Sequence, residues 1–333
     1  MKNTIKRLIP AGMKRKLQSL ENEHRVRGYF KVQARDIDKY FAFPDNTGQR
    51  QIETQLLFFS HQLEKGLSHS NFRSGFGRRP LTMILDLLDT YRKKGYNPNT
   101  FELEVTYSVL KAYRERHLGN GYEMPMAFSA IYGKYNKEID GAESDLGGAK
   151  EIHADASYDK TYCNVIENRV SIREFGSGPV DVNLIDNALK VAVHAPSVCN
   201  RQSQNVRVVL NPEKIHQVLR IQGGWNGYKD PPALLLMTSH LSSFNNAVER
   251  NEPYVDGGIF SMALLGALEE QNLAACPLNA MFSKEQDDGV RGILAVPREE
   301  VMVMFIALGN KPEQVLHPIS SRRDYRSIVQ YID

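Results

Sequence analysis

Two arginines and a serine alternate along one short segment of the chain, at Arg169, Ser171 and Arg173. In an extended turn, alternate side chains project to the same side of the backbone. A phosphate dianion is bound well by a planar, bidentate guanidinium together with a short hydroxyl donor, and these residues supply both. A guanidinium would also stabilise negative charge on the edge of a reduced aromatic cofactor. Taken alone, such a cluster more often forms surface ion pairs, here with Glu167 or Glu174.

A second polar segment begins at Pro196 and Ser197 and continues with Asn200 and Gln202. Proline ends the preceding helix, and serine favours a turn. Each amide side chain offers both a donor and an acceptor, which is the mixed pattern that the N3–H group and the two carbonyls of a flavin ring require. The simpler interpretation is a turn that only stops a helix.

Both segments need elements that position them, and the surrounding sequence predicts a mixture of helices and strands. Asp181 is placed to cap a helix that runs to Ala192. Residues 255–273 are apolar almost all round, which predicts a helix that is buried on most sides. Strands are expected at the apolar runs 206–210, 233–238 and 301–308. Because strands and helices intersperse without a regular β-α-β repeat, the sequence favours an α+β layered fold over a Rossmann sheet.

This ordered set of segments resembles the nitroreductase family of FMN-dependent oxidoreductases. The family pattern runs from Arg-x-Ser-x-Arg-x-Phe through a helix to Ala-Pro-Ser-x-x-Asn-x-Gln and then into a strand, and residues 169–210 contain each part in that order. The likeness continues through Asp256-Gly257-Gly258, the run 307–312 and the basic pair Arg322-Arg323. It therefore covers roughly residues 160–333.

The resemblance implies a mixed, mainly antiparallel sheet flanked by helices, and an FMN cofactor that NADH or NADPH reduces. The nicotinamide would pass hydride to the flavin N5 and leave, and a small-molecule acceptor would then take the electrons in a ping-pong cycle. The chemistry would lie with the flavin, so no protein side chain is expected to be catalytic. Members of the family are homodimers with the flavin in the interface, so we expect a second copy of this chain as partner. Ser203 and Gln204 stand where the family often has proline and an aromatic residue, so the acceptor is not implied.

The resemblance also implies which residues bind the cofactor. Arg169, Ser171 and Arg173 would hold the phosphate, the ribityl chain and the N1/O2 edge of the flavin. Four residues would reach the flavin from the partner subunit: Pro196, Ser197, Asn200 and Gln202. The remaining expected contacts are Asn279, Ala280 with its backbone N–H towards N5, Gly309, and Arg322 or Arg323 at the phosphate.

The first part of the chain has no counterpart in that family and is predicted to be mainly helical. Apolar residues recur at helical spacing over 51–67, 81–91, 101–118 and 126–135. The small-residue run 141–149 then loses this periodicity. We therefore expect a mainly helical N-terminal domain over residues 1–150, followed by the nitroreductase-like domain over residues 151–333.

Three further features have two interpretations each. His61 and Glu64 share a helix face and supply half of a di-iron motif, but no second Glu-x-x-His follows, so we expect no metal. The Gly- and Arg-rich turn 72–79 would suit an anionic substrate, or is a solvated loop. Trp225, in a glycine-flanked loop, either covers the flavin ring or anchors a core.

Composition argues against several other classes of protein. Of the 333 residues, 41% are hydrophobic and 24% charged, and the net charge of +3 is too small to favour nucleic acid as a partner. The three cysteines form no Cys-x-x-Cys pair, so we expect neither a disulfide nor a zinc site. Cys199 and Cys276 are expected to have packing roles. This use of cysteine favours the reducing environment of the cytoplasm. The longest apolar runs are too short for a transmembrane segment. The basic segment 1–16 is expected to be a frayed, solvated terminus, the alternative being contact with an anionic membrane surface.

Two alternative functions fit the same residues. The helical region would suit a specialised, flavin-dependent biosynthetic dehydrogenase or reductase that acts on a metabolite, a carrier-bound substrate or a saccharide. Alternatively, the protein would bind flavin without catalysis and use its N-terminal helices as a scaffold for a partner.

Overall fold

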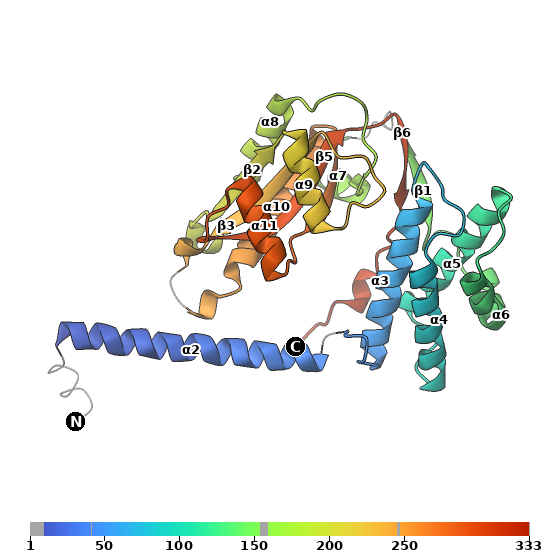
Figure 1. The fold of residues 1–333 in the computed structure, drawn as a ribbon, viewed down its shortest axis with the longest axis horizontal. Helices are drawn as coiled ribbons and strands as arrows, with labels where there is room; N and C mark the ends of the chain where they lie inside the picture. The colour runs from blue at the N-terminus through green and yellow to red at the C-terminus, as the bar shows by residue number, and fades with distance from the viewer. Residues whose placement is uncertain (1–9, 41, 154–158, 245–246, 333) are drawn as a thin grey trace. The chain divides into compact units, whose positions relative to one another are not determined.

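The computed structural model describes residues 10–40, 42–153, 159–244 and 247–332. These residues form two compact units, whose elements are labelled in Figure 1. The first, named here the sheet unit, comprises Met1–Tyr40, Asp159–Arg169 and Phe175–Lys311. The second, the helical unit, comprises Phe41–Tyr158, Val170–Glu174 and Pro312–Asp333. Each unit therefore gathers segments that are far apart in the sequence.

The sheet unit is built on a four-stranded antiparallel sheet with the strand order β2-β3-β5-β4. Its strands are β2 (Gln204–Val209), β3 (Ala233–His240), β4 (Leu273–Asn279) and β5 (Glu300–Asn310). The register of β3 against β5 shifts once, between Met237 and Thr238. Nearly all of β3 is buried because helices cover both faces of the sheet.

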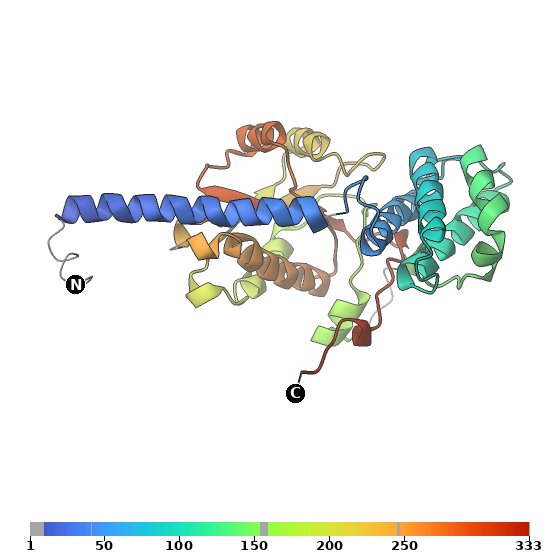
Figure 2. The same cartoon turned by 90° about the horizontal axis from the view of Figure 1, so that it is seen from below.

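The sheet unit also contains α-helices. They are α2 (Ala11–Tyr40), α7 (Tyr162–Asn168), α8 (Val182–Ala192), α9 (Pro212–Gln222), α10 (Glu252–Glu270) and α11 (Lys284–Leu294), with the 3-10 turns η1 (Val198–Asn200), η2 (Leu241–Ser243) and η3 (Ala247–Glu249). Helices α8 and α10 cover one face of the sheet and α9 and α11 the other, as Figure 2 shows. Leu235 and Met237 pack towards the first pair, whereas Leu234 and Leu236 pack towards the second, because neighbouring strand residues face opposite sides.

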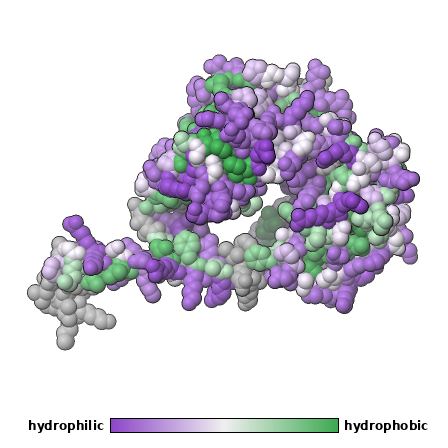
Figure 3. Space-filling model, viewed as in Figure 1, coloured by the Kyte–Doolittle hydropathy of each residue, from purple (hydrophilic) through white to green (hydrophobic). Residues whose placement is uncertain are grey.

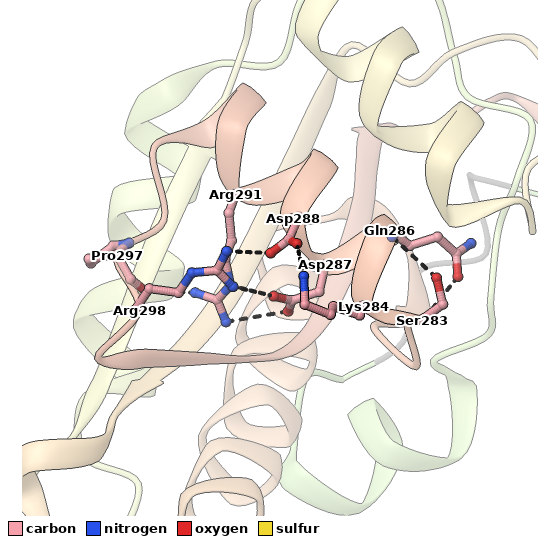
Figure 4. Close-up of polar contacts among 8 residues, drawn as sticks. All are labelled: Ser283, Lys284, Gln286, Asp287, Asp288, Arg291, Pro297 and Arg298. Atoms are coloured by element: carbon pink, nitrogen blue, oxygen red, sulfur yellow. Dashed lines mark hydrogen bonds and ion pairs between the residues drawn. The ribbon is translucent and has the colours of Figure 1, made fainter.

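Local polar contacts fix the start and the end of α11 (Figure 4). Ser283 and Gln286 form a capping box, in which each side chain accepts a hydrogen bond from the backbone N–H of the other. One turn later, the Asp287 carboxylate accepts from Arg291 Nε at 2.5 Å, and Arg291 Nη1 donates to the Pro297 carbonyl at 2.6 Å. Arg298 also pairs with Asp287 and with Asp288. These contacts set the direction in which the chain leaves α11 for β5.

Helix α2 exposes much of its apolar surface. Met13, Leu17, Leu20 and Phe30 are all more than two-fifths exposed, and Figure 3 shows apolar patches interspersed with hydrophilic ones along this helix. Residues 1–9, the larger part of the basic segment 1–16, lie outside the described residues. Among the helices that the structure describes, none is both long enough and apolar enough to cross a membrane.

The helical unit has a core of its own. Its elements are α3 (Gln49–Leu67), α4 (Arg78–Lys93), α5 (Phe101–Gly119), α6 (Met126–Gly141), the paired antiparallel strands β1 (Ala149–His153) and β6 (Gln314–Pro318), and the 3-10 turn η4 (Tyr325–Ser327). The four helices bury a continuous cluster that includes Leu56, Ile84, Tyr113 and Phe128. This cluster is distinct from the two apolar clusters on the faces of the larger sheet.

The glycine-rich run before β1 packs tightly within the helical unit. A Cβ atom on Gly147 would lie 2.9 Å from the Val109 backbone nitrogen, so only glycine fits there. Gly148 has a left-handed φ of +116°, and its N–H donates to the buried carboxylate of Glu64 at 3.2 Å. The boundary expected near residue 150 stays a prediction.

The predicted fold class, a mixed α+β arrangement with an antiparallel sheet and a helical N-terminal region, is confirmed. The helices expected over 51–67, 81–91 and 101–118 are present, and the one expected over 126–135 continues to Gly141. The prediction for 255–273 is wrong in part. Helix α10 ends at Glu270 and Leu273 begins β4. Ile259 and Met262 on α10 are about two-fifths exposed because none of the residues that the structure describes covers them fully.

Candidate functional site

The loop at residues 196–202 in the sheet unit has an unusual backbone. Cys199, Asn200 and Gln202 all adopt left-handed conformations, with φ values of 48°, 55° and 47°. Such strain in residues other than glycine concentrates at binding sites, where the surrounding structure enforces it. The Asn200 and Gln202 side chains are exposed, and Gln202 Nε2 lies 3.3 Å from Asn200 Oδ1. The loop therefore presents two amide groups together at the surface.

A buried carboxylate holds this loop in place. Asp256, in the first turns of α10, is 1% exposed, and its two oxygens accept from the Val198 N–H at 3.1 and 3.2 Å. The Ser197 hydroxyl accepts from the Gln202 N–H at 3.0 Å and closes the loop from the other side. The sequence indicated Asp256 only as part of the family likeness at the start of an apolar helix, with no contact to this loop. The sequence feature that could have indicated its role is an acidic residue at the start of an otherwise apolar helix.

A bidentate ion pair supports the end of the loop. Arg201 donates to both oxygens of Glu249 at 3.0 Å and to the Ser243 carbonyl at 2.8 Å. This hydrogen-bonded pair raises the pKa of Arg201, so the guanidinium stays charged. The prediction that Cys199 packs in the interior is wrong, because the left-handed turn exposes it, whereas Cys276 is buried in β4 as predicted.

Pro196 lies at an apolar groove beside the loop. The groove has a volume of about 580 Å³ and is lined by α7, α8 and α10, with Val165, Val191, Ile259 and Met262 among its residues. It lies along the same face of α10 that the single chain leaves uncovered.

The residues expected near the flavin N5 lie where β4 ends. Asn279 is exposed, its Oδ1 accepts from the Met281 N–H at 3.2 Å, and Ala280 follows it, half-buried. The geometry thus leaves Asn279 at the surface of the sheet unit.

Gly309 is buried within β5 and has a packing role in this structure. A Cβ atom there would lie 2.4 Å from Phe175 Cγ, so glycine lets the Phe175 ring lie against the strand. That ring stacks on Trp225 with 6.1 Å between centroids, and Trp225 is buried with its Nε1 donating to the Lys229 carbonyl at 2.9 Å. Of the two interpretations of Trp225, the structure therefore supports the core anchor.

The first predicted motif is divided between the two units. Arg169 is the C-cap residue of α7 in the sheet unit, and its N–H donates to the Val165 carbonyl at 3.0 Å. Ser171 and Arg173 belong to the helical unit, where Arg173 Nη1 lies 3.4 Å from the Ser171 carbonyl. Ile172 between them is buried and anchors the segment.

The basic pair Arg322 and Arg323 is also in the helical unit, and the two residues differ in their contacts. Arg323 forms an ion pair with the buried carboxylate of Glu102 and lies over the Phe101 ring. Arg322 donates to the Ser320 carbonyl, and Ser320 has a left-handed φ of 50°. Both side chains are exposed, and Arg323 is tied to a buried carboxylate.

The donor set in these segments fits the chemistry of FMN. Residues 169–173 supply guanidiniums and a hydroxyl, as a phosphate requires. Residues 200–202 supply exposed amides, as the polar rim of the ring requires.

Residues 166–240 match the nitroreductase family model. This span contains the motif from Arg169 to Arg173 and the whole loop at 196–202, so the family resemblance found in the sequence is confirmed.

Several solved structures are similar to this chain over about half its length. A candidate NADH dehydrogenase/NAD(P)H nitroreductase from Parabacteroides distasonis has 18% identity and a TM-score of 0.45, and the match covers 50% of this chain and 96% of that one. A candidate NAD(P)H:FMN oxidoreductase from Staphylococcus epidermidis has 17% identity and a TM-score of 0.46, with coverage of 53% and 98%. A nitroreductase-like protein from Streptococcus mutans has 18% identity and a TM-score of 0.44, with coverage of 52% and 98%.

Proposed function

We propose that this protein is an FMN-dependent oxidoreductase of the nitroreductase type, which uses NADH or NADPH to reduce a small-molecule acceptor. The observation that supports this is the family match over residues 166–240, which includes both segments with FMN-binding chemistry. When bound, FMN supplies the chemistry by accepting hydride from the nicotinamide and passing the electrons to the acceptor. The protein's own task is to bind, orient and electrostatically tune the reactants.

The residue roles in this proposal follow from the chemistry of each side chain. Together, Arg169, Ser171 and Arg173 hold the phosphate, the ribityl chain and the N1/O2 edge of the flavin. Asn200 and Gln202 hydrogen-bond to the polar rim of the ring, supported by their exposure and their fixed backbone. The remaining proposed contacts are Pro196, Ser197, Asn279, the backbone N–H of Ala280, Gly309, and Arg322 or Arg323.

The proposed assembly is a homodimer in which residues 196–202 reach the flavin of the partner subunit. The apolar groove at Pro196 and the exposed Ile259 and Met262 support it, because a second copy would bury them. Sedimentation of the purified protein should give twice the monomer mass, and introducing a charge by Met262→Glu should shift it towards the monomer.

A direct test measures flavin binding by purified, full-length protein after incubation with FMN and removal of unbound cofactor. We expect the visible absorbance of bound flavin and its bleaching by NADH or NADPH. Replacing the exposed amide by Asn200→Ala should weaken FMN binding about tenfold, because a buried ring edge loses a hydrogen bond. Asn187→Ala, an exposed asparagine on α8, is the matched control and should leave binding unchanged. Protein that binds no FMN at all would rule the proposal out.

A further inference from the structure

Helix α2 has two parts that differ in their exposure. In the second part, Tyr29 and Gln33 are partly buried, and the Arg250 guanidinium lies over the Tyr29 ring at 4.7 Å from its centre. In the first part, every residue from Arg15 to Gly28 is exposed. The second part is therefore attached to the rest of the sheet unit, whereas the first part leaves its side chains accessible.

The accessible part begins with a short apolar stripe. Met13, Leu17 and Leu20 are 58%, 45% and 55% exposed. Because an α-helix has 3.6 residues per turn, positions 13, 17 and 20 lie within about 60° of one another around its axis. By the same spacing, the exposed residues Arg15 and Ser19 lie on the opposite side. The first turns of α2 therefore have one apolar face and one polar face.

Positive charge is concentrated in the same part of the chain. Residues 1–20 contain six of the 42 lysines and arginines and none of the 39 acidic residues. Residues 21–333 therefore contain 36 basic and 39 acidic residues, so their net charge is −3, against +6 for residues 1–20. Lys16 is exposed and lies beside the apolar stripe by helical spacing. A lysine in that position lays its methylene groups along an apolar surface and keeps its ammonium group in water.

We propose that residues 13–20 of α2 bind the surface of a membrane that contains anionic lipids. The apolar stripe enters the boundary between headgroups and acyl chains, and the basic residues contact the negatively charged headgroups. The charge of residues 1–20 selects an anionic surface over a zwitterionic one. This inference does not rest on the proposed function, because it uses no residue that is assigned to the flavin.

A bilayer suits this face better than a second protein does. A stable protein interface buries about 800 Å² on each partner and usually has aromatic or arginine side chains at its centre. The stripe consists of three apolar side chains that are each about half exposed, and residues 1–20 contain no aromatic residue. The stripe is therefore too small for a protein partner, whereas a fluid bilayer requires no matching shape.

The test measures the binding of the full-length protein to lipid vesicles by sedimentation. One set of vesicles is phosphatidylcholine, and in the other about one-third of the lipid is phosphatidylglycerol. We expect at least about tenfold stronger binding to the anionic vesicles, and loss of that binding at about 0.5 M salt, which screens the charges. Equal binding to both sets, or no binding to the anionic vesicles, would overturn the proposal.

A pair of matched variants tests the apolar stripe. Leu17→Glu should weaken binding to the anionic vesicles at least about tenfold, because it places a carboxylate among the inserted side chains. Leu118→Glu makes the same change at a leucine that is 53% exposed at the end of α5. It should alter binding by less than about twofold. Equal losses in the two variants, or none in Leu17→Glu, would show that the stripe does not enter the bilayer.

A second pair tests the basic residues. Lys16→Gln should weaken binding to the anionic vesicles about fivefold, the contribution of one basic residue at such a surface. Lys137→Gln removes the same charge from the exposed surface of α6 and is the control. It should leave the binding unchanged. Equal losses in these two variants would contradict the assignment of the headgroup contact to α2.

Sedimentation without vesicles tests whether a second copy of the chain covers the same face. We expect Leu17→Glu to leave the mass of the protein in solution unchanged. If it lowered that mass and left vesicle binding unchanged, the stripe would be a contact between two copies and the proposal would be wrong. FMN binding by Leu17→Glu should equal that of the wild type. Failure of the proposed function would appear in that measurement alone, since vesicle binding requires no flavin.

Discussion

Two loops of this protein carry exposed polar groups, and each is held by buried polar residues of a different kind. In the sheet unit, the loop at 196–202 has a strained backbone and is held by the buried carboxylate of Asp256 and by the ion pair of Arg201 with Glu249. In the helical unit, the loop that follows α3 is anchored by His117 and Tyr113 within an aromatic cluster. The first loop has a family motif, whereas the second has none.

The difference shows what each loop requires of its surroundings. A left-handed backbone at three residues is costly, and one buried acceptor compensates for only part of that cost. The loop after α3 needs little backbone strain beyond its glycines, and its rigidity comes from packed rings around satisfied hydrogen bonds. Removing a contact of the sheet-unit loop should therefore mainly change the conformation of that loop. Removing a contact of the helical-unit loop should mainly lower the free energy of unfolding.

Removing the anchor of the helical-unit loop should have the largest effect on folding. His117→Ala would leave the Gly75 N–H without its acceptor and open a cavity among Phe72, Phe76 and Tyr113. We expect the free energy of unfolding to fall by about 3 kcal/mol, measured by urea denaturation followed by circular dichroism. His24→Ala, on the exposed surface of α2, is the control and should change it by less than about 0.5 kcal/mol. Equal effects of the two substitutions would contradict the assigned role of His117.

Removing the anchor of the sheet-unit loop should have a smaller effect on stability. Asp256→Ala leaves the Val198 N–H unsatisfied, which should lower the free energy of unfolding by about 2 kcal/mol. Asp256→Asn retains an acceptor oxygen and should lose less than half of that. Because the loop presents Asn200 and Gln202, the alanine variant should also weaken FMN binding more than its loss of stability alone accounts for. An alanine variant with unchanged FMN affinity would show that Asp256 does not position the loop.

How far the sequence predicts this structure depends on the range of the interactions involved. The helices α3, α4 and α5 were predictable because apolar residues recur in each of them at helical spacing. Strand β4 was not, because the helix predicted over 255–273 was carried through the polar run 269–272, where α10 ends and the chain turns into β4. Helix α2 was predicted only as part of the mainly helical region 1–150, without bounds of its own.

The candidate site shows the same limit. The motif residues from Arg169 to Gln202 were recognisable locally, and the family match covers them. The contacts that fix them are long-range: Asp256 with Val198, and Ser70 with Glu174. No local pattern pairs such residues, because the pairing is decided by how helices and loops pack.

The two units should also differ in how acid lowers their stability, and this is the smallest of the expected effects. Burial lowers the pKa of His117 and of His317 in the helical unit, so the unfolded chain binds more protons than the folded one. Stability from these residues is present above their ordinary pKa of 6.5 and is lost as the pH falls below it. In the sheet unit, burial acts to raise the pKa of Glu300, but hydrogen bonds from Arg207 and Thr238 outweigh it and keep the pKa below the ordinary 4.5. Its contribution is therefore lost only at more acidic pH.

The two units should thus weaken in separate pH windows. Trp225, the one tryptophan of the chain, lies in the sheet unit and reports on it by fluorescence, while hydrogen exchange follows the amides of α3 and α5. Between pH 6.5 and 4.5, the protection of the amides in α3 and α5, measured relative to the intrinsic exchange rate at each pH, should fall before the fluorescence changes. In His117→Gln, which has no titrating group at that position, the loss of protection should begin at lower pH. If the Trp225 fluorescence changed first, Glu300 and not the buried histidines would determine the pH at which the protein begins to lose stability.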